Sequence, residues 1–181
     1  HICYFHFALQ HSCILYYIDF LQNVLNSLHR LQLHDKISFM RTKLTKKQIH
    51  LLIIAIGMIF TLLSLFHTNI WFDESYSVSL ATHSFSEIWR IDSHDVHPVF
   101  YYQCLHCLYL LVGENIQVYR LFSWACLAMM GIFGYTGIRK DYGEECGLWF
   151  SFFVFFFPVN VVYAGEIRMY TLVSLFILLG I

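Results

Sequence analysis

The fold is decided by the apolar run Leu51-Leu-Ile-Ile-Ala-Ile-Gly-Met-Ile-Phe-Thr-Leu-Leu-Ser-Leu-Phe66. It lies within a candidate membrane span over about residues 49–70, and a helix of this length can cross a bilayer core of about 30 Å at about 1.5 Å per residue. Trp71 follows where interfacial aromatic residues lie on the far side. The segment before the run carries four basic residues, which predicts a cytoplasmic N-terminal end of the span: Arg41, Lys43, Lys46 and Lys47.

The composition of the whole chain also indicates a lipid environment. Of its 181 residues, 58% are hydrophobic and 13% are charged, and the mean hydropathy is +0.58. Soluble domains carry about a quarter charged residues. A net charge of -1 without a large basic field disfavours a nucleic acid partner. The close pair Cys104 and Cys107 could be a redox pair or half a zinc site, but without a second such pair it is interpreted as small residues on a packed helix.

Three further apolar runs predict an all-α, polytopic membrane protein. They cover residues 121–138, residues 147–163 and, incompletely, residues 169–181. The external loop 71–120 separates the first two spans. The chain is therefore expected to be an integral, multi-pass membrane protein.

The external loop is expected to contain juxtamembrane helices on the extracytoplasmic side. Apolar residues at helical spacing predict an amphipathic helix over 76–90 on the membrane surface. The apolar segment 99–112 is too short for an ordinary span, so an interfacial or buried helix is expected there. If 99–112 crossed the membrane, Arg139-Lys140 would be external, against the positive-inside rule. The interfacial arrangement is therefore preferred.

The two ends of the chain differ from its centre. Residues 1–39 are apolar and rich in histidine, without a clean span, whereas Met40 opens the basic segment Met-Arg-Thr-Lys-Leu-Thr-Lys-Lys, which is typical of a natural start. Residues 1–39 are thus interpreted either as mistranslated upstream sequence or as an amphipathic N-terminal helix. Residues 40–181 are expected to be the truncated N-terminal part of a larger transmembrane domain.

Asp73 and Glu74 lie within a few residues of the first span, where charge is costly and often functional. If this segment is helical, the two side chains project about 100° apart. One carboxylate could then face a substrate while the other holds a metal, an arginine or a helix end. The alternative is that both acids mark the water boundary and favour the start of the next helix.

A second polar cluster is expected at the same membrane face. Glu166 and Tyr170 are four residues apart and would share one helical face, with Arg168 between them. Arg168 and Tyr170 alone would also fit an interfacial anchor. Arg120, at the external start of the second span, could meet a phosphate or a carboxylate, or could snorkel to the interface.

The turn after residue 91 contains oxygen and nitrogen ligands that suit a divalent cation or a phosphate contact, although a solvated loop has the same composition. The residues are Asp92, His94, Asp95 and His97. A metal site at Asp95 and His97 is the specific hypothesis.

In order along the chain, four motifs resemble those of lipid-linked-sugar glycosyltransferases with the GT-C membrane fold, the protein O-mannosyltransferase-like and aminoarabinose-transferase-like group. The motifs are Trp71-Phe-Asp-Glu-Ser-Tyr76, Asp95-Val-His-Pro98, Tyr119-Arg120-Leu121 and Tyr163-Ala-Gly-Glu-Ile-Arg-Met-Tyr170. The resemblance covers about residues 49–181.

The resemblance implies an inverting sugar transfer from a polyprenyl-phosphate donor to a hydroxyl of a protein, lipid or glycan acceptor. Asp73 would be the catalytic base, and Glu74 and Glu166 would help to organise the acceptor or a divalent cation. The remaining candidates would bind the donor phosphate or the acceptor: His97, Arg120, Arg168 and Tyr170.

The resemblance further implies a cell-membrane location with an extracytoplasmic active site, and no activity for this piece alone. The competing hypotheses are a transporter or flippase, which acids confined to one membrane face disfavour, and a non-catalytic membrane scaffold, in which Asp73 would be dispensable.

Overall fold

The computed structural model describes residues 44–66, 69–93 and 97–180. The expectations for residues 1–39 and for Met40 lie outside these residues. Contacts divide the chain into residues 1–49 and residues 50–181, and the packing described below is that of the second unit.

Over the described ranges all regular elements are helices, which confirms the all-α prediction there. In chain order they are α3 (Lys46–Leu63), α4 (Phe72–Ala81), α5 (Phe85–Asp92), α6 (Val99–Val112), α7 (Ile116–Phe133), the π-helix η1 (Gly134–Ile138), α8 (Arg139–Tyr142), α9 (Glu144–Phe156), α10 (Pro158–Ala164) and α11 (Tyr170–Leu179).

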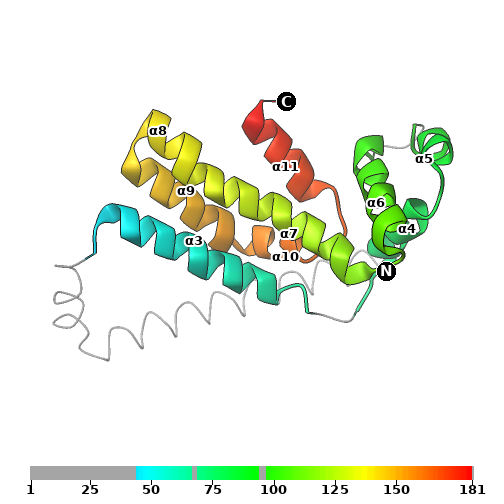
Figure 1. Ribbon diagram of the computed structural model, residues 1–181, viewed down its shortest axis with the longest axis horizontal. Helices are drawn as coiled ribbons and strands as arrows, with labels where there is room; N and C mark the ends of the chain where they lie inside the picture. The colour runs from blue at the N-terminus through cyan, green and yellow to red at the C-terminus, as the bar shows by residue number, and fades with distance from the viewer. Residues whose placement is uncertain (1–43, 67–68, 94–96, 181) are drawn as a thin grey trace, which may run out of the picture. The chain divides into compact units, whose positions relative to one another are not determined.

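Among the described residues, two helices are long and apolar enough to cross a membrane: α3, and the continuous helix Ile116–Tyr142 that joins α7, η1 and α8. A third span results if α9 and α10, which are bent by 60°, are counted together. Figure 1 shows α3, α7 and α9 running alongside one another.

The helices differ from the predicted spans at three places. The first span is helical only to Leu63 rather than to about residue 70, and the second begins at Ile116 rather than at 121. The third is broken at Phe157, because Pro158 lacks an N–H and cannot continue α9. The Asn160 side chain donates to the carbonyl oxygens of Phe153 (3.4 Å) and Val154 (3.2 Å), so the break leaves these acceptors partnered.

The predicted amphipathic helix 76–90 is in fact two helices, α4 and α5. Ser84 starts α5 through a capping box: its backbone N–H and its hydroxyl donate to Glu87 Oε2 at 3.0 and 2.6 Å. This cap stabilises a new helix start, so the chain turns after Ala81 instead of continuing α4.

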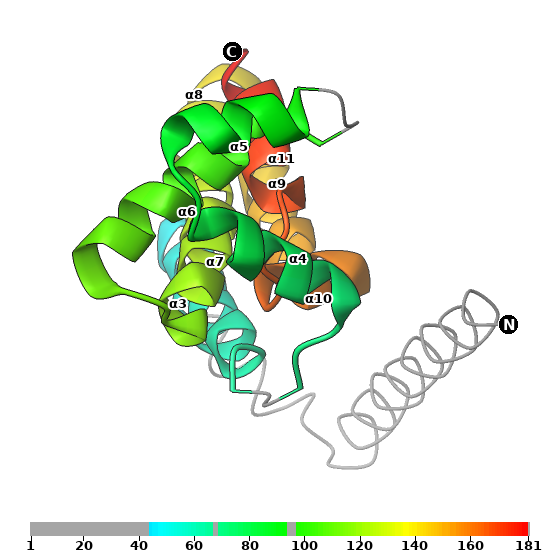
Figure 2. The ribbon, with the colours of Figure 1, turned by 90° about the vertical axis from the view of Figure 1, so that its right-hand side faces the viewer.

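The short apolar helix over residues 99–112 is present as α6, with the bounds that the sequence predicts. It packs against α4 and α5 and runs across the direction of α7 (Figures 1 and 2). His106 joins the three juxtamembrane helices: its Nδ1 lies 2.9 Å from the carbonyl oxygen of Ala81, and its ring lies 4.5 Å from that of Phe85. Helices α4, α5 and α6 thus form a packed helical unit.

Small residues let the long helices approach closely. The fully buried ring of Phe155 fills the space at Gly57 of α3 and Gly131 of α7, where a Cβ atom would overlap it. The Trp124 indole N–H donates to the Thr61 hydroxyl at 3.1 Å, which adds a polar link between α7 and α3. Packing of this kind is typical of helix pairs in membranes, where small residues admit close contact.

Candidate functional site

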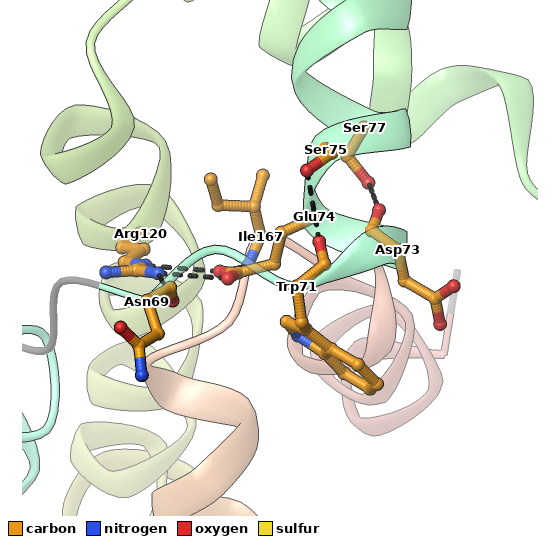
Figure 3. Close-up of polar contacts among 8 residues, drawn as sticks. All are labelled: Asn69, Trp71, Asp73, Glu74, Ser75, Ser77, Arg120 and Ile167. Carbon is orange, nitrogen blue, oxygen red and sulfur yellow. Dashed lines mark hydrogen bonds and ion pairs between the residues drawn. The ribbon is translucent and has the colours of Figure 1, made fainter. Parts of the chain in front are cut away.

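Asp73 and Glu74 lie in the first turn of α4 and point in different directions (Figure 3). Glu74 is fully buried, and its carboxylate accepts hydrogen bonds from Arg120 Nε at 3.1 Å and Arg120 Nη2 at 2.9 Å. The Asp73 side chain keeps 41% of its surface exposed. The geometric expectation from the sequence therefore holds: one acid of the pair binds an arginine, and the other is left to face outward.

The Glu74 carboxylate connects three separate segments. Besides Arg120 of α7, it accepts the backbone N–H of Ile167, at 3.0 Å, from the loop between α10 and α11. Arg120 Nη2 also donates to the backbone oxygen of Asn69, at 3.0 Å, in the connection before α4. We call this set of four residues the Glu74 clamp; it fixes the start of α4 against α7 and against the loop that carries Glu166.

Arg120 was expected to meet a phosphate or a carboxylate, or to snorkel to the interface; it binds the carboxylate of Glu74, and its side chain is only 1% exposed. The reason is that α7 begins at Ile116, which places Arg120 inside the helix, where it faces the bundle. A guanidinium bound on one edge by a carboxylate and buried on all sides is suited to hold structure. The geometry therefore favours a structural role for Arg120.

Arg168 approaches Asp73 from the α10–α11 loop. Its Nη2 lies 3.5 Å from Asp73 Oδ2, 3.4 Å from His97 Nε2 and 3.5 Å from the Tyr170 hydroxyl. Its guanidinium carbon also lies 5.6 Å from the centre of the Tyr170 ring. The structure thus brings together four of the residues that the sequence singled out, from three segments of the chain.

Glu166 lies beside this cluster in a non-helical loop. Residues 165–169 form turns and bends, and α11 begins only at Tyr170, so the expectation that Glu166 and Tyr170 share a helical face was wrong. The buried Oε2 of Glu166 has no hydrogen-bond partner among the described residues. Burial, reinforced by the nearby Glu74 carboxylate, raises the pKa of Glu166 to about 7. Glu166 can therefore hold or release a proton near neutral pH.

Two tyrosine rings lie close to His97 of this cluster. The His97 ring lies 6.2 Å from the ring of Tyr76 and 6.3 Å from that of Tyr102. Burial raises the pKa of the Tyr102 hydroxyl, so it stays protonated at ordinary pH. Of these two tyrosines, only Tyr76 could have been found from the sequence, because it lies three residues after Asp73 on α4 and shares its helical face.

Of the two residues in the predicted metal site, only His97 lies within the described residues. Asp95 and His94 lie outside the described residues, whereas His97 contacts Arg168. Within residues 44–66, 69–93 and 97–180, no three His, Cys, Asp or Glu side chains are grouped so as to hold a metal ion. Cys104 and Cys107 are free thiols. A divalent cation at Asp95 and His97 stays a prediction.

The sequence and the fold were compared with protein families, curated proteins and solved structures, and none of the three comparisons finds a match.

Proposed function

We propose that this chain is part of a membrane glycosyltransferase that moves a sugar from a polyprenyl phosphate to an acceptor hydroxyl at the extracytoplasmic face of the cell membrane. The observation that carries the proposal is the division of the acidic pair. The Glu74 carboxylate is bound within the buried Glu74 clamp, while the Asp73 side chain is 41% exposed and lies beside Arg168. This is the arrangement expected if Asp73 meets a substrate and Glu74 positions it.

In the proposed reaction Asp73 accepts the proton of the acceptor hydroxyl while the hydroxyl oxygen attacks the anomeric carbon. The bond from that carbon to the phosphate oxygen breaks, its electron pair leaves with the polyprenyl phosphate, and the sugar inverts. General-base catalysis needs a carboxylate that an incoming hydroxyl can reach, and the exposure of Asp73 meets this requirement.

In this reaction Arg168 and His97 would bind the phosphate of the sugar donor. Guanidinium groups pair well with phosphate oxygens through charge-assisted hydrogen bonds. Arg168 is held among Asp73, His97 and Tyr170 at 3.4–3.5 Å, distances that leave its donors weakly engaged. A donor phosphate could therefore recruit these donors without breaking a strong interaction.

The proposal is tested by Asp73→Asn in the full-length protein, reconstituted in vesicles with a polyprenyl-phosphate sugar. Loss of a general base is expected to lower the rate of sugar transfer by about 10²–10⁴-fold. Asp141→Asn is the matched control, because Asp141 is an exposed acid of α8 outside the site. Transfer by Asp73→Asn at the rate of the control would contradict the proposal and favour a scaffold or a transporter.

A further inference from the structure

A cavity of about 470 Å³ lies between the last turns of the helix Ile116–Tyr142 and the start of α9. Its lining combines two cations, one carboxylate and three uncharged residues: Arg139, Lys140, Glu144, Tyr135, Thr136 and Gly143. None of these residues belongs to the Asp73 cluster or to the Glu74 clamp. The cavity therefore needs an explanation of its own.

The Arg139 side chain is fixed at the cavity wall. Its Nη2 donates to Glu144 Oε1 at 2.7 Å, and its guanidinium carbon lies 4.8 Å from the centre of the Tyr135 ring. Only one of the five N–H donors of the guanidinium is needed for the bond to Glu144. The side chain keeps 26% of its surface exposed, so the other donors can reach a ligand.

Lys140 supplies a second, unused cation. Its side chain is exposed, and it forms no ion pair with any residue that the structure describes. Next to it, Gly143 makes a turn with φ of 97°, and a Cβ atom added there would meet nothing within 4 Å. The cavity lining is thus uncrowded at Gly143.

The backbone of this region is specialised as well. Residues Gly134–Ile138 form a π-helix, a conformation that is rare and is found often at functional sites. It includes Tyr135 and Thr136, so the irregular turn forms one wall of the cavity. A regular helix would rotate these two side chains relative to Arg139 and Lys140.

The surroundings indicate the level of lipid headgroups. Tyr142 and Trp149 lie close by in the sequence and are 72% and 54% exposed, and such aromatic residues are enriched at the boundary between hydrocarbon and water. Basic pockets between membrane helices on the cytoplasmic side bind the phosphates of anionic lipids. This is the side to which the positive-inside rule assigns Arg139 and Lys140.

We propose that this cavity binds the phosphate of an anionic phospholipid headgroup, with Lys140 and Arg139 as its ligands and with Glu144 as a competing carboxylate. The competition has a consequence that a general surface charge would not have. Removing the Lys140 charge weakens binding, whereas removing the Glu144 charge strengthens it by freeing Arg139.

The test uses the full chain in nanodiscs of phosphatidylcholine with added phosphatidylglycerol, and native mass spectrometry counts the lipids that stay bound. Lys140→Gln is expected to lower the retention of phosphatidylglycerol about fivefold, and Glu144→Gln is expected to raise it. Arg90→Gln removes an exposed cation of α5 and is expected to leave retention unchanged.

The outcomes separate this site from its alternatives. Equal losses in Lys140→Gln and Arg90→Gln would overturn the proposal, because the effect would then be that of net charge. Displacement of the bound phosphatidylglycerol by added inorganic phosphate would also overturn it, in favour of a site for a soluble anion. Because no sugar transfer is measured, the result is independent of the function proposed for Asp73.

Discussion

Removing the Glu74 carboxylate is expected to destabilise the protein far more than removing a carboxylate from a shorter ion pair at the surface. In Glu74→Ala the guanidinium of Arg120, whose side chain is 1% exposed, loses its counter-charge and cannot turn to water. The Ile167 N–H loses its acceptor at the same time.

The expected magnitude follows from this burial. Leaving one partner of a buried ion pair without its counter-charge costs about 3–5 kcal/mol, and an unsatisfied buried N–H adds about 1–3 kcal/mol. The Arg139–Glu144 pair is the matched comparison, since it joins the same residue types at 2.7 Å but with side chains 26% and 49% exposed. Pairs at the surface contribute little to stability, so Glu144→Ala is expected to change it only slightly.

Both variants are compared by denaturant unfolding in the same detergent, followed by circular dichroism. The buried pair is tested further with Glu74→Leu combined with Arg120→Leu, which removes both charges at once. This double variant is expected to be more stable than Glu74→Leu alone, because no buried charge is left unpaired. If Glu74→Ala and Glu144→Ala lose the same stability, the reasoning about the clamp is refuted.

Three further outcomes are expected. The pKa of Glu166 is raised to about 7 in the folded state from its ordinary 4.5, so the free energy of unfolding falls as pH rises between these two values. Glu166→Gln should remove this fall, which is measured by denaturant unfolding at a pH below and a pH above this range. Gly57→Ala would place a Cβ 2.5 Å from Phe155 Cβ and Cγ and cost about 1–3 kcal/mol, measured by thermal unfolding and relieved in part by Phe155→Leu. Trp124→Phe removes the 3.1 Å bond to Thr61 and should cost about 0.5–1.5 kcal/mol in calorimetry.

The sequence was a good guide to which segments are helical and a poor guide to where they end. Long apolar runs and the 14-residue length of α6 predicted these helices directly. The ends were missed where local chemistry overrides periodicity. Ser84 and Glu87 carry the spacing of a capping box, and Pro158 removes a backbone donor. Both signals are visible in the sequence, and both were outweighed there by the continuity of the apolar pattern.

The site shows a different limit. That Asp73 and Glu74 diverge follows from helix geometry alone, and the structure agrees. The partner of Glu74 does not follow, because Arg120 lies 46 residues away and its orientation depends on where α7 begins. The N–H of Ile167 could not be found either, since every residue carries such a donor and only tertiary packing selects one.

The Glu74 clamp also explains why one member of the acidic pair, Glu74, is buried. The half-exposed carboxylate of Asp73 lies in the first turn of α4, so it would shift with any movement of that helix end. Glu74 removes this freedom by tying the turn to α7 through Arg120 and to the α10–α11 loop through Ile167. The same loop carries Arg168, so the contact between Asp73 and Arg168 depends on Glu74 even though the Glu74 carboxylate is bound to Arg120 and Ile167 instead. If Asp73 is a general base, a change at Glu74 should therefore alter its placement without removing its carboxylate, and activity lost in Glu74→Gln should reflect geometry rather than chemistry.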